Sequence, residues 1–451
     1  MKQLYELAEF VCNMSFDHLP EQVVEAAKYC MIDNISAALG GSDDSMMESV
    51  IQTFLSYDGN GNDAYLWGHK KRVPMRTAAF LNGMMGHVLE LDDVHTDSKA
   101  HIGTVVIPAA WAMGNRLGSD GKRMIEAILC GYEVMARIGK GFGVVSHRSK
   151  GWHVTSTAGT FGAAAACAKL LQLDVNQTVS AFGLAGTQSF GTWAFLPDGA
   201  TNKILHPGKA ALNGMDAAIL AKAGMKGPSH ILDSVDGGIY PAMSDDFHYE
   251  YVAQKLGTRY EILYVDKKTY PCCRSTHCAI DGAIDLCEKY GIEPDQIERV
   301  LIKTYQVGYR QCGSDGPSQN PQKPTEAKFS TPYTVACAII NHNVTLNDFL
   351  PDRLMDKKIR TLMHKIKVEP EEKYTERYPD HWGCKISICC KNQKEFSVEV
   401  PDASGSVDFP LSKLQMWKKS DSILSGKSTF LSENIRKQFM MLEKQPVLPV
   451  I

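Results

Sequence analysis

The densest group of residues able to transfer protons lies in the segment 90–101, ELDDVHTDSKAH, between two apolar stretches. It begins with Glu90, contains Asp93 and ends with His101. Carboxylates and imidazoles enclosed between core-forming segments have pKa values shifted by burial and by one another, as acid–base catalysis requires. A solvated loop with an aspartate that caps a helix would have the same composition, so both interpretations remain open on these residues alone.

Further basic and imidazole side chains precede two predicted helices. His153 comes before the Ala-rich segment 156–172, and Lys203 and His206 come before a helix predicted at 207–223. Because the N-terminus of a helix attracts anions, these side chains are candidates for binding a carboxylate. A structural histidine and a solvated basic loop are the alternatives.

A third group of candidate residues lies in KKTYPCCRSTH at 267–277. It contains Lys268, Tyr270, Cys273, Arg274 and His277. Neighbouring cysteines cannot easily share one tetrahedral ion, and the chain has no Cys-x-x-Cys pair, so we predict no zinc, iron–sulfur cluster or other metal. The alternative is a pair of packed thiols beside a basic loop.

Two nucleotide-binding patterns are incomplete. The GKGFG run at 139–143 follows a helical pattern instead of a strand, and the SGKS run at 425–428 lacks both the first glycine and a preceding strand. Neither indicates a bound nucleotide, and we expect no cofactor.

The overall composition excludes several classes of partner. The 451 residues include 48 basic and 51 acidic side chains, a net charge of −3, so the surface as a whole does not attract nucleic acid or anionic membranes. The chain has no run of about 18 apolar residues and no signal-peptide pattern at its start, so we expect a cytoplasmic protein. Its 13 cysteines are best interpreted as reduced thiols.

The spacing of apolar residues predicts a mainly α protein with two domains. Residues 1–266 show helical periodicity, 267–400 mix helices with strands, and 401–451 return to a helical pattern that is expected to rejoin the first part. The β-like runs are ERVLIKTYQV, HKIKVEP, CKISICC and EFSVEV. We therefore predict a large all-helical domain and a smaller α+β domain.

Four segments in this order resemble the MmgE/PrpD family: LELDDVHTDSKAH, WHVTSTAGTFGAAAACAKLL, TNKILHPGKAALNGMDAA and KKTYPCCRSTH. This family includes 2-methylcitrate dehydratase, cis-aconitate decarboxylase and iminodisuccinate epimerase. The resemblance covers nearly the whole chain. It implies that the helical domain is built from both chain ends, that the smaller domain is a lid inserted between them, and that a homodimer has its active site at the domain junction.

The resemblance also assigns site residues. From the decarboxylase pattern it carries over His101, His153, Lys203 and Lys268. Cys273 stands where that pattern has a histidine thought to handle the proton, and His277 lies one helical turn later as an alternative proton carrier. Glu90 replaces an aspartate of the pattern, and Val94 replaces a threonine.

These residues together favour a cofactor-independent lyase, a dehydratase or a decarboxylase, that acts on a small di- or tricarboxylate. Cationic side chains stabilise the negative charge that forms when a proton or CO2 leaves next to a carboxylate. The alternatives are an epimerase of a small dicarboxylate and a catalytically inactive helical binding protein. If the histidines and lysines converge on one pocket, we expect repulsion to lower the lysine pKa values and to leave the histidines partly neutral.

Overall fold

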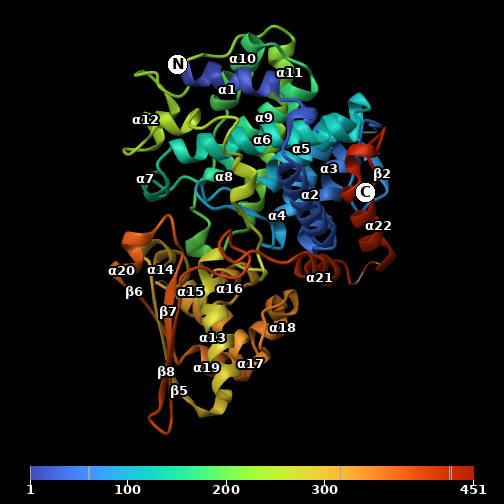
Figure 1. Ribbon diagram of the computed structural model, residues 1–451. Coiled ribbons are helices and arrows are strands. Elements are labelled where there is room, and N and C mark those ends of the chain that lie inside the picture. Colours follow the sequence, from blue (N-terminus) through green and yellow to red (C-terminus); the bar gives the residue numbers. More distant parts are fainter. Residues whose placement is uncertain (1, 59–60, 315, 426, 428) are drawn as a thin grey trace.

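The chain folds around two large hydrophobic cores in the computed structural model, which describes residues 2–58, 61–314, 316–425, 427 and 429–451 (Figure 1). The first core extends from Leu4 to Ile262 and includes Leu424 to Leu448 at the C-terminal end. The second core extends from Tyr270 to Ala403. Gly426 and Ser428 of the rejected phosphate-loop pattern lie outside the described residues.

Helices form almost all of the part built around the first core. They are α1 (Lys2–Asn13), α2 (Glu21–Gly41), α3 (Ser45–Tyr57), α4 (Met75–Val88), α5 (Gly103–Leu117), α6 (Gly121–Gly141), α7 (Val144–Ser149), α8 (Val154–Thr157), α9 (Gly159–Leu170), α10 (Val175–Gly186), α11 (Leu205–Lys222) and α12 (Ile239–Met243). The helix predicted at 207–223 is α11, which begins two residues earlier. The Ala-rich segment forms two helices, α8 and α9.

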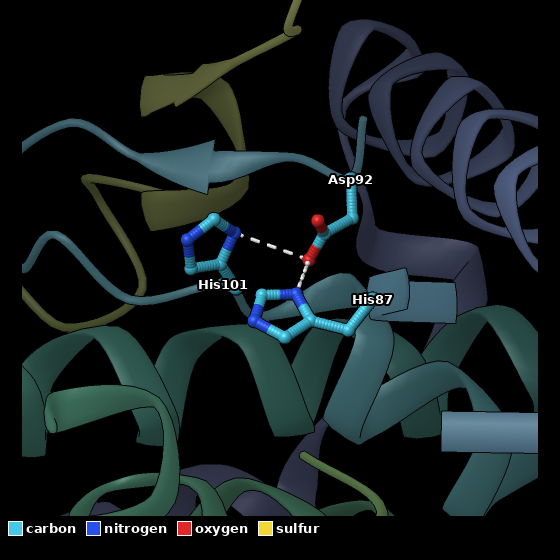
Figure 2. A group of neighbouring side chains, drawn as sticks. All are labelled: His87, Asp92 and His101. Carbon is cyan, nitrogen blue, oxygen red and sulfur yellow. Dashed lines mark hydrogen bonds and ion pairs between the residues drawn. The ribbon is translucent and has the colours of Figure 1, made fainter. Parts of the chain in front are cut away.

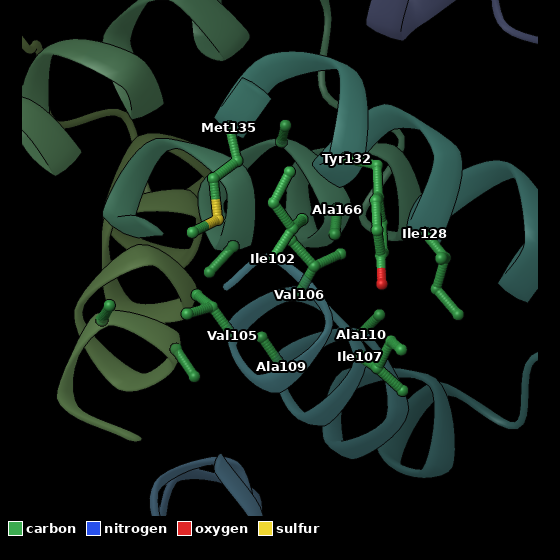
Figure 3. Close-up of a cluster of buried hydrophobic side chains, with 14 of the residues drawn as sticks. Ile102, Val105, Val106, Ile107, Ala109, Ala110, Ile128, Tyr132, Met135 and Ala166 are labelled. Atoms are coloured by element: carbon green, nitrogen blue, oxygen red, sulfur yellow. The ribbon is translucent and has the colours of Figure 1, made fainter. Parts of the chain in front are cut away.

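Helices α5, α6 and α9 cross closely at the centre of this part (Figure 3). A Cβ atom on Gly162 of α9 would lie 2.6 Å from the Cβ atom of Met135 on α6, and 3.0 Å from the carbonyl oxygen of Gly131. Glycine is therefore required at this crossing, and the small residues of α9 allow the α6 backbone to approach. The result is a rigid support beneath the segments that carry His101 and His153.

There are two short antiparallel pairs of strands, of which the first is local and the second joins distant parts of the chain. Strand β1 (Ala64–Leu66) pairs with β2 (Lys71–Val73), and β3 (Val94–His95) pairs with β4 (Val265–Asp266). The second pair places the polar segment 90–101 beside the start of the segment 267–277.

The part around the second core contains a four-stranded sheet and short helices. The strands are β5 (Ile297–Thr304), β6 (Ile366–Pro370), β7 (Cys384–Cys390) and β8 (Glu395–Val400), in the order β6-β5-β7-β8. Only β5 and β6 are parallel. The helices are α13 (His277–Tyr290), α14 (Gln306–Cys312), α15 (Gly316–Gln319), α16 (Pro324–Lys328), α17 (Thr331–Asn341), α18 (Pro351–Leu354), α19 (Lys357–Met363) and α20 (Glu372–Arg377).

One face of this sheet packs against α13 and α17. At Gly282 of α13 an added Cβ atom would lie 2.6 Å from Ile386 Cγ2 on β7, so the helix lies directly on the strands. The four β-like runs form these four strands, except that 305–307 leave β5 and begin α14.

The last two helices, α21 (Lys413–Leu424) and α22 (Thr429–Met440), return to the helical part and pack against α2 (Figure 1). A buried ion pair joins Lys419 of α21 to Asp33 of α2 at 2.6 Å. The prediction of a mainly α protein with a large helical and a smaller α+β domain is confirmed. Within the described residues, every helix is too short or too polar to cross a membrane.

Candidate active site

A cavity of about 60 Å³ lies where the two parts of the chain meet. Since one water needs roughly 10–15 Å³ by this measure, the cavity admits a small organic molecule. Its wall contains the predicted residues Glu90, His101, His153, Lys203, Lys268, Cys273 and Arg274. Other residues of the wall include Lys99, His147, Arg148, Trp193, Gln311, Phe329, Tyr378 and Trp382.

Glu90 holds two lysines together at one end of this cavity. It follows the end of α4 in a left-handed conformation, with φ at 57°, and its side chain is buried. Lys203 Nζ lies 2.5 Å from its Oε1 atom, and Lys268 Nζ lies 3.1 Å from its Oε2 atom. Burial opposes ionisation of Glu90, but the two ammonium groups hold its pKa well below the usual range.

The pKa of Lys268 is raised, whereas the sequence predicts that repulsion lowers it. Burial favours the neutral form of Lys268, but the carboxylates of Glu90 and Asp92 outweigh burial and raise the pKa. Repulsion between cations does not lower it, because Glu90 lies between the two lysines and shields them from each other. Lys268 therefore remains an ammonium group at neutral pH.

Asp92 connects two histidines in this site (Figure 2). His87 Nδ1 hydrogen-bonds Asp92 Oδ2 at 2.7 Å, and Lys203 Nζ lies 2.8 Å from His87 Nε2. An ammonium group can only donate, so His87 Nε2 must accept and the proton of this ring must reside on Nδ1. The carboxylate of Asp92 is thereby linked through His87 to Lys203.

His101 lies against the same Asp92 oxygen, with Nδ1 at 3.1 Å but without hydrogen-bond alignment (Figure 2). Burial lowers the pKa of His101 to about 4, although Asp92 acts in the opposite direction. The imidazole is thus neutral at pH 7 and can accept a proton. Asp92 favours the proton on Nδ1, which leaves Nε2 as the basic atom.

His153 pairs with a second histidine. It immediately precedes α8, and its Nδ1 atom lies 2.8 Å from Nδ1 of His206 on α11. Burial, and then the neighbouring His206, lower the pKa of His153 well below its usual range, and burial lowers that of His206 to about 4. His206 therefore orients His153 from outside the cavity wall.

Cys273 lies on the side of the cavity formed by the part around the second core, at the start of the short 3-10 helix Arg274–Thr276. A hydrogen bond with Cys312 lowers the pKa of Cys273 to about 7, although burial opposes this shift. Thiol and thiolate are therefore both accessible near neutral pH, and Cys273 can donate or accept a proton.

Four predicted residues do not line the cavity: His206, which lies behind His153, and Asp93, Tyr270 and His277. Asp93 accepts hydrogen bonds from the Gly103 backbone at the start of α5 and from Tyr132. Tyr270 donates to Asp281, and His277 accepts from Arg274 and lies 3.4 Å from the Cys272 carbonyl. Arg274 does reach the cavity, but it is bound to Asp266 at 3.0 Å. Of the two candidate proton carriers in this segment, Cys273 is the one that faces the cavity.

The polar residues of this site that were not predicted include His87, Asp92, Lys99 and Arg148. His87 is three residues before Glu90 at the end of an apolar helix, and this helical spacing was the available signal. Lys99 belongs to the polar segment 90–101 but was not singled out within it, whereas Arg148 has no such signal, because only the fold brings it to the cavity.

One candidate metal site overlaps this network. Among the described residues, His87, Asp92 and His101 each place a ligand atom within 4.8 Å of the others, as do His381, Asp402 and Asp408 outside the cavity. In the first group His87 donates directly to Asp92, and the Lys203 ammonium occupies its other nitrogen. A neighbouring ammonium group disfavours a bound cation, so the geometry is better described as a hydrogen-bond network.

The sequence comparisons agree with this architecture. Residues 5–252 match the MmgE/PrpD N-terminal domain, and residues 270–439 match the MmgE/PrpD C-terminal domain. The chain therefore belongs to the MmgE/PrpD family.

Relatives in this family include lyases of small acids. The cis-aconitate decarboxylase-like protein oryM of Aspergillus oryzae is 27% identical, with 80% of this chain and 78% of the relative aligned. The cis-aconitate decarboxylase of Aspergillus terreus is 25% identical over 82% and 78%. The 2-methylcitrate dehydratase of Salmonella typhimurium is 21% identical over 100% and 93%. These relatives support a lyase-type enzyme.

Proposed function

We propose that this protein is a cofactor-independent lyase, a dehydratase or decarboxylase, that acts on a small di- or tricarboxylate. The observation that carries the proposal is the pairing of two buried ammonium groups, Lys203 and Lys268, with a neutral imidazole, His101, in one cavity. The names of the decarboxylase and dehydratase relatives support the same class of substrate.

The charges of the site suit such a reaction. Lys203 and Lys268 hold fixed ammonium groups at the cavity, beside the carboxylates of Glu90 and Asp92. When a proton or CO2 leaves next to a substrate carboxylate, negative charge develops there, and fixed ammonium groups stabilise it. The site therefore favours the transition state over the bound substrate.

Proton transfer is assigned to His101 and Cys273. His101 is neutral and can take a proton at Nε2, while Asp92 stabilises the resulting imidazolium. Cys273, on the lid side, supplies the proton that neutralises a carbanion or a leaving hydroxyl group. His153, oriented by His206, completes the wall and can hold a substrate oxygen.

The test is turnover of a panel that contains cis-aconitate and 2-methylcitrate, followed by proton NMR in deuterated water after exhaustive chelation. We expect loss of CO2 or water, unaffected by chelation. His101→Ala should lower turnover by about 100-fold or more. Deuterium incorporated at an intact stereocentre would instead indicate an epimerase, and binding without any reaction would indicate an inactive binding protein. Activity that returns only with added metal would contradict cofactor independence.

A cytoplasmic location is part of this proposal. All 13 cysteines are free thiols, and most are buried, which suits a reducing compartment. The proposed binding partner is the substrate itself, a small anionic carboxylate.

A further inference from the structure

Arg148, on the short helix α7, presents a guanidinium group to the cavity without an acidic partner. Its Cζ atom lies 4.2 Å from the centre of the Trp193 ring. Within the described part of the chain, no hydrogen bond or ion pair holds this side chain, and its buried Nε atom has no partner. The donors of Arg148 are therefore available to a ligand.

Buried cations elsewhere in the described residues form ion pairs with carboxylates. Arg137 is bound to Glu133 at 3.1 Å, Arg274 to Asp266 at 3.0 Å, and Lys268 to Glu90 at 3.1 Å. Burying a cation is unfavourable unless an anion compensates it, so these pairs follow the usual rule. The half-buried Arg148 on the cavity wall has no such pair among the residues described, and a bound anion would compensate its charge.

A second cation lies on the same wall. Lys99 donates to the carbonyl groups of Thr96 and Pro379, and its Nζ atom lies 4.4 Å from the Trp382 ring centre. It makes no ion pair within 4.0 Å among the described residues. Burial lowers the pKa of Lys99 to about 7, so a nearby anion would favour its charged form.

Lys99 Nζ lies 5.4 Å from the centre of the Tyr378 ring, and Arg148 interacts electrostatically with the same tyrosine, whereas Lys203 and Lys268 face Glu90. Burial lowers the pKa of Arg148 to about 10, while Tyr378 and Cys273 act in the opposite direction, and Lys268 in turn helps to lower the pKa of Cys273. Cys273 thus lies within electrostatic reach of Arg148 and of Lys268. A substrate held at both would have its reacting carbon near this thiol.

We propose, on the basis of the lyase function above, that Arg148 with Lys99 binds a second carboxylate of the substrate, apart from the carboxylate held by Lys203 and Lys268. A guanidinium group offers parallel N–H donors that match a carboxylate in a bidentate geometry. The substrate class is therefore an acid with two carboxylates separated by a short carbon chain, and Arg148 determines specificity for the second one.

The first experiment measures the dissociation constant of cis-aconitate and 2-methylcitrate by calorimetry. Arg148→Gln should weaken binding of the better ligand by about 10- to 100-fold, the usual effect of a hydrogen bond to a charged group, and Arg148→Lys should lose less. Arg72→Gln is the matched control, because Arg72 also lies over an aromatic ring, that of Tyr65 at 4.7 Å, but outside the cavity. Unchanged binding by Arg148→Gln would overturn the subsite.

The second experiment separates ligand binding from a structural role. Without ligand, Arg148→Gln removes a half-buried cation that has no anionic partner in the described part of the chain, so its melting temperature should equal or exceed that of the native protein. A clear fall would show that Arg148 stabilises the fold through Trp193 and would overturn the proposal. Binding of the acids without turnover would contradict the lyase function alone, whereas turnover with an unchanged KM in Arg148→Gln would contradict the subsite alone.

Discussion

Among single residues, Cys273 has a thiol whose protonation changes near neutral pH. If the thiol is the proton donor, turnover is present below its pKa of about 7 and is lost as pH rises through that value. Cys273→Ser should lower kcat by about 100-fold or more and remove this alkaline decline, because a hydroxyl group does not ionise in the range. The measurement is a pH profile of kcat.

Cys312 provides the control for this assignment. Its hydrogen bond is the main cause of the lowered pKa of Cys273, so Cys312→Ala should shift the alkaline decline upward, toward the ordinary thiol value. If the pH profile of kcat is the same in the native protein, Cys273→Ser and Cys312→Ala, Cys273 is not the proton donor.

Glu90 is the carboxylate that pairs with both buried lysines of the site, Lys203 and Lys268. Its pKa is lowered, so its contribution to stability is complete above the unfolded value of about 4.5 and is lost as pH falls through the folded value. Glu90→Gln leaves two buried ammonium groups without their anion and should cost about 3–5 kcal/mol in the free energy of unfolding at pH 7. Urea denaturation at several pH values measures both effects.

The exposed pair of Lys413 with Glu25, at 2.7 Å, is the control for Glu90. Glu25→Gln should change stability little, because solvent screens surface ion pairs. Equal stability of Glu90→Gln and the native protein at pH 7 would refute the view that Glu90 compensates both lysines.

At the level of elements, the crossing of α6 and α9 sets the position of the segments that carry the histidines. Gly162→Ala would force a methyl group against Met135 and the Gly131 carbonyl. Overpacking of this kind costs about 1–3 kcal/mol, which exceeds the gain of about 1 kcal/mol from helix propensity. A lowered denaturation midpoint is the expected result.

Gly316→Ala is the matched substitution, since a Cβ atom there meets nothing within 4 Å. It should leave the midpoint close to that of the native protein. If Gly162→Ala is equally harmless, the two helices can separate more easily than their contacts indicate.

For the whole molecule, the cavity exists only because the two cores are held in one arrangement. The ion pair of Arg274 with Asp266 and the pairing of β3 with β4 lie at their junction. The helical part contributes Glu90, Lys203 and the histidines, and the part around the second core contributes Cys273 and Tyr378. Substrate specificity therefore depends on both parts.

The homodimer remains a prediction at this scale, made from the family resemblance. Sedimentation velocity at micromolar concentration should give twice the mass of one chain. A monomer that retains full activity would contradict both the dimer and any requirement of the site for a second subunit.

The sequence by itself determined the elements and the chemical types of the site. Apolar periodicity identified the helical part, and alternating runs such as CKISICC identified the strands, because both patterns reflect which face of an element is buried. Glu90, His101, His153, Lys203, Lys268 and Cys273 stood out because each lies in a short polar segment beside an apolar one.

Only the tertiary structure decided how these groups act on one another. The direction of the Lys268 shift depends on Glu90 lying between the lysines, which no spacing reveals. His277 and Tyr270 lie close to Cys273 in the chain, yet hydrogen bonds to Arg274 and Asp281 hold them outside the cavity. Arg148 reaches the cavity from α7 only through the folding of the chain. Electrostatic effects depend on distance and burial, and folding determines both.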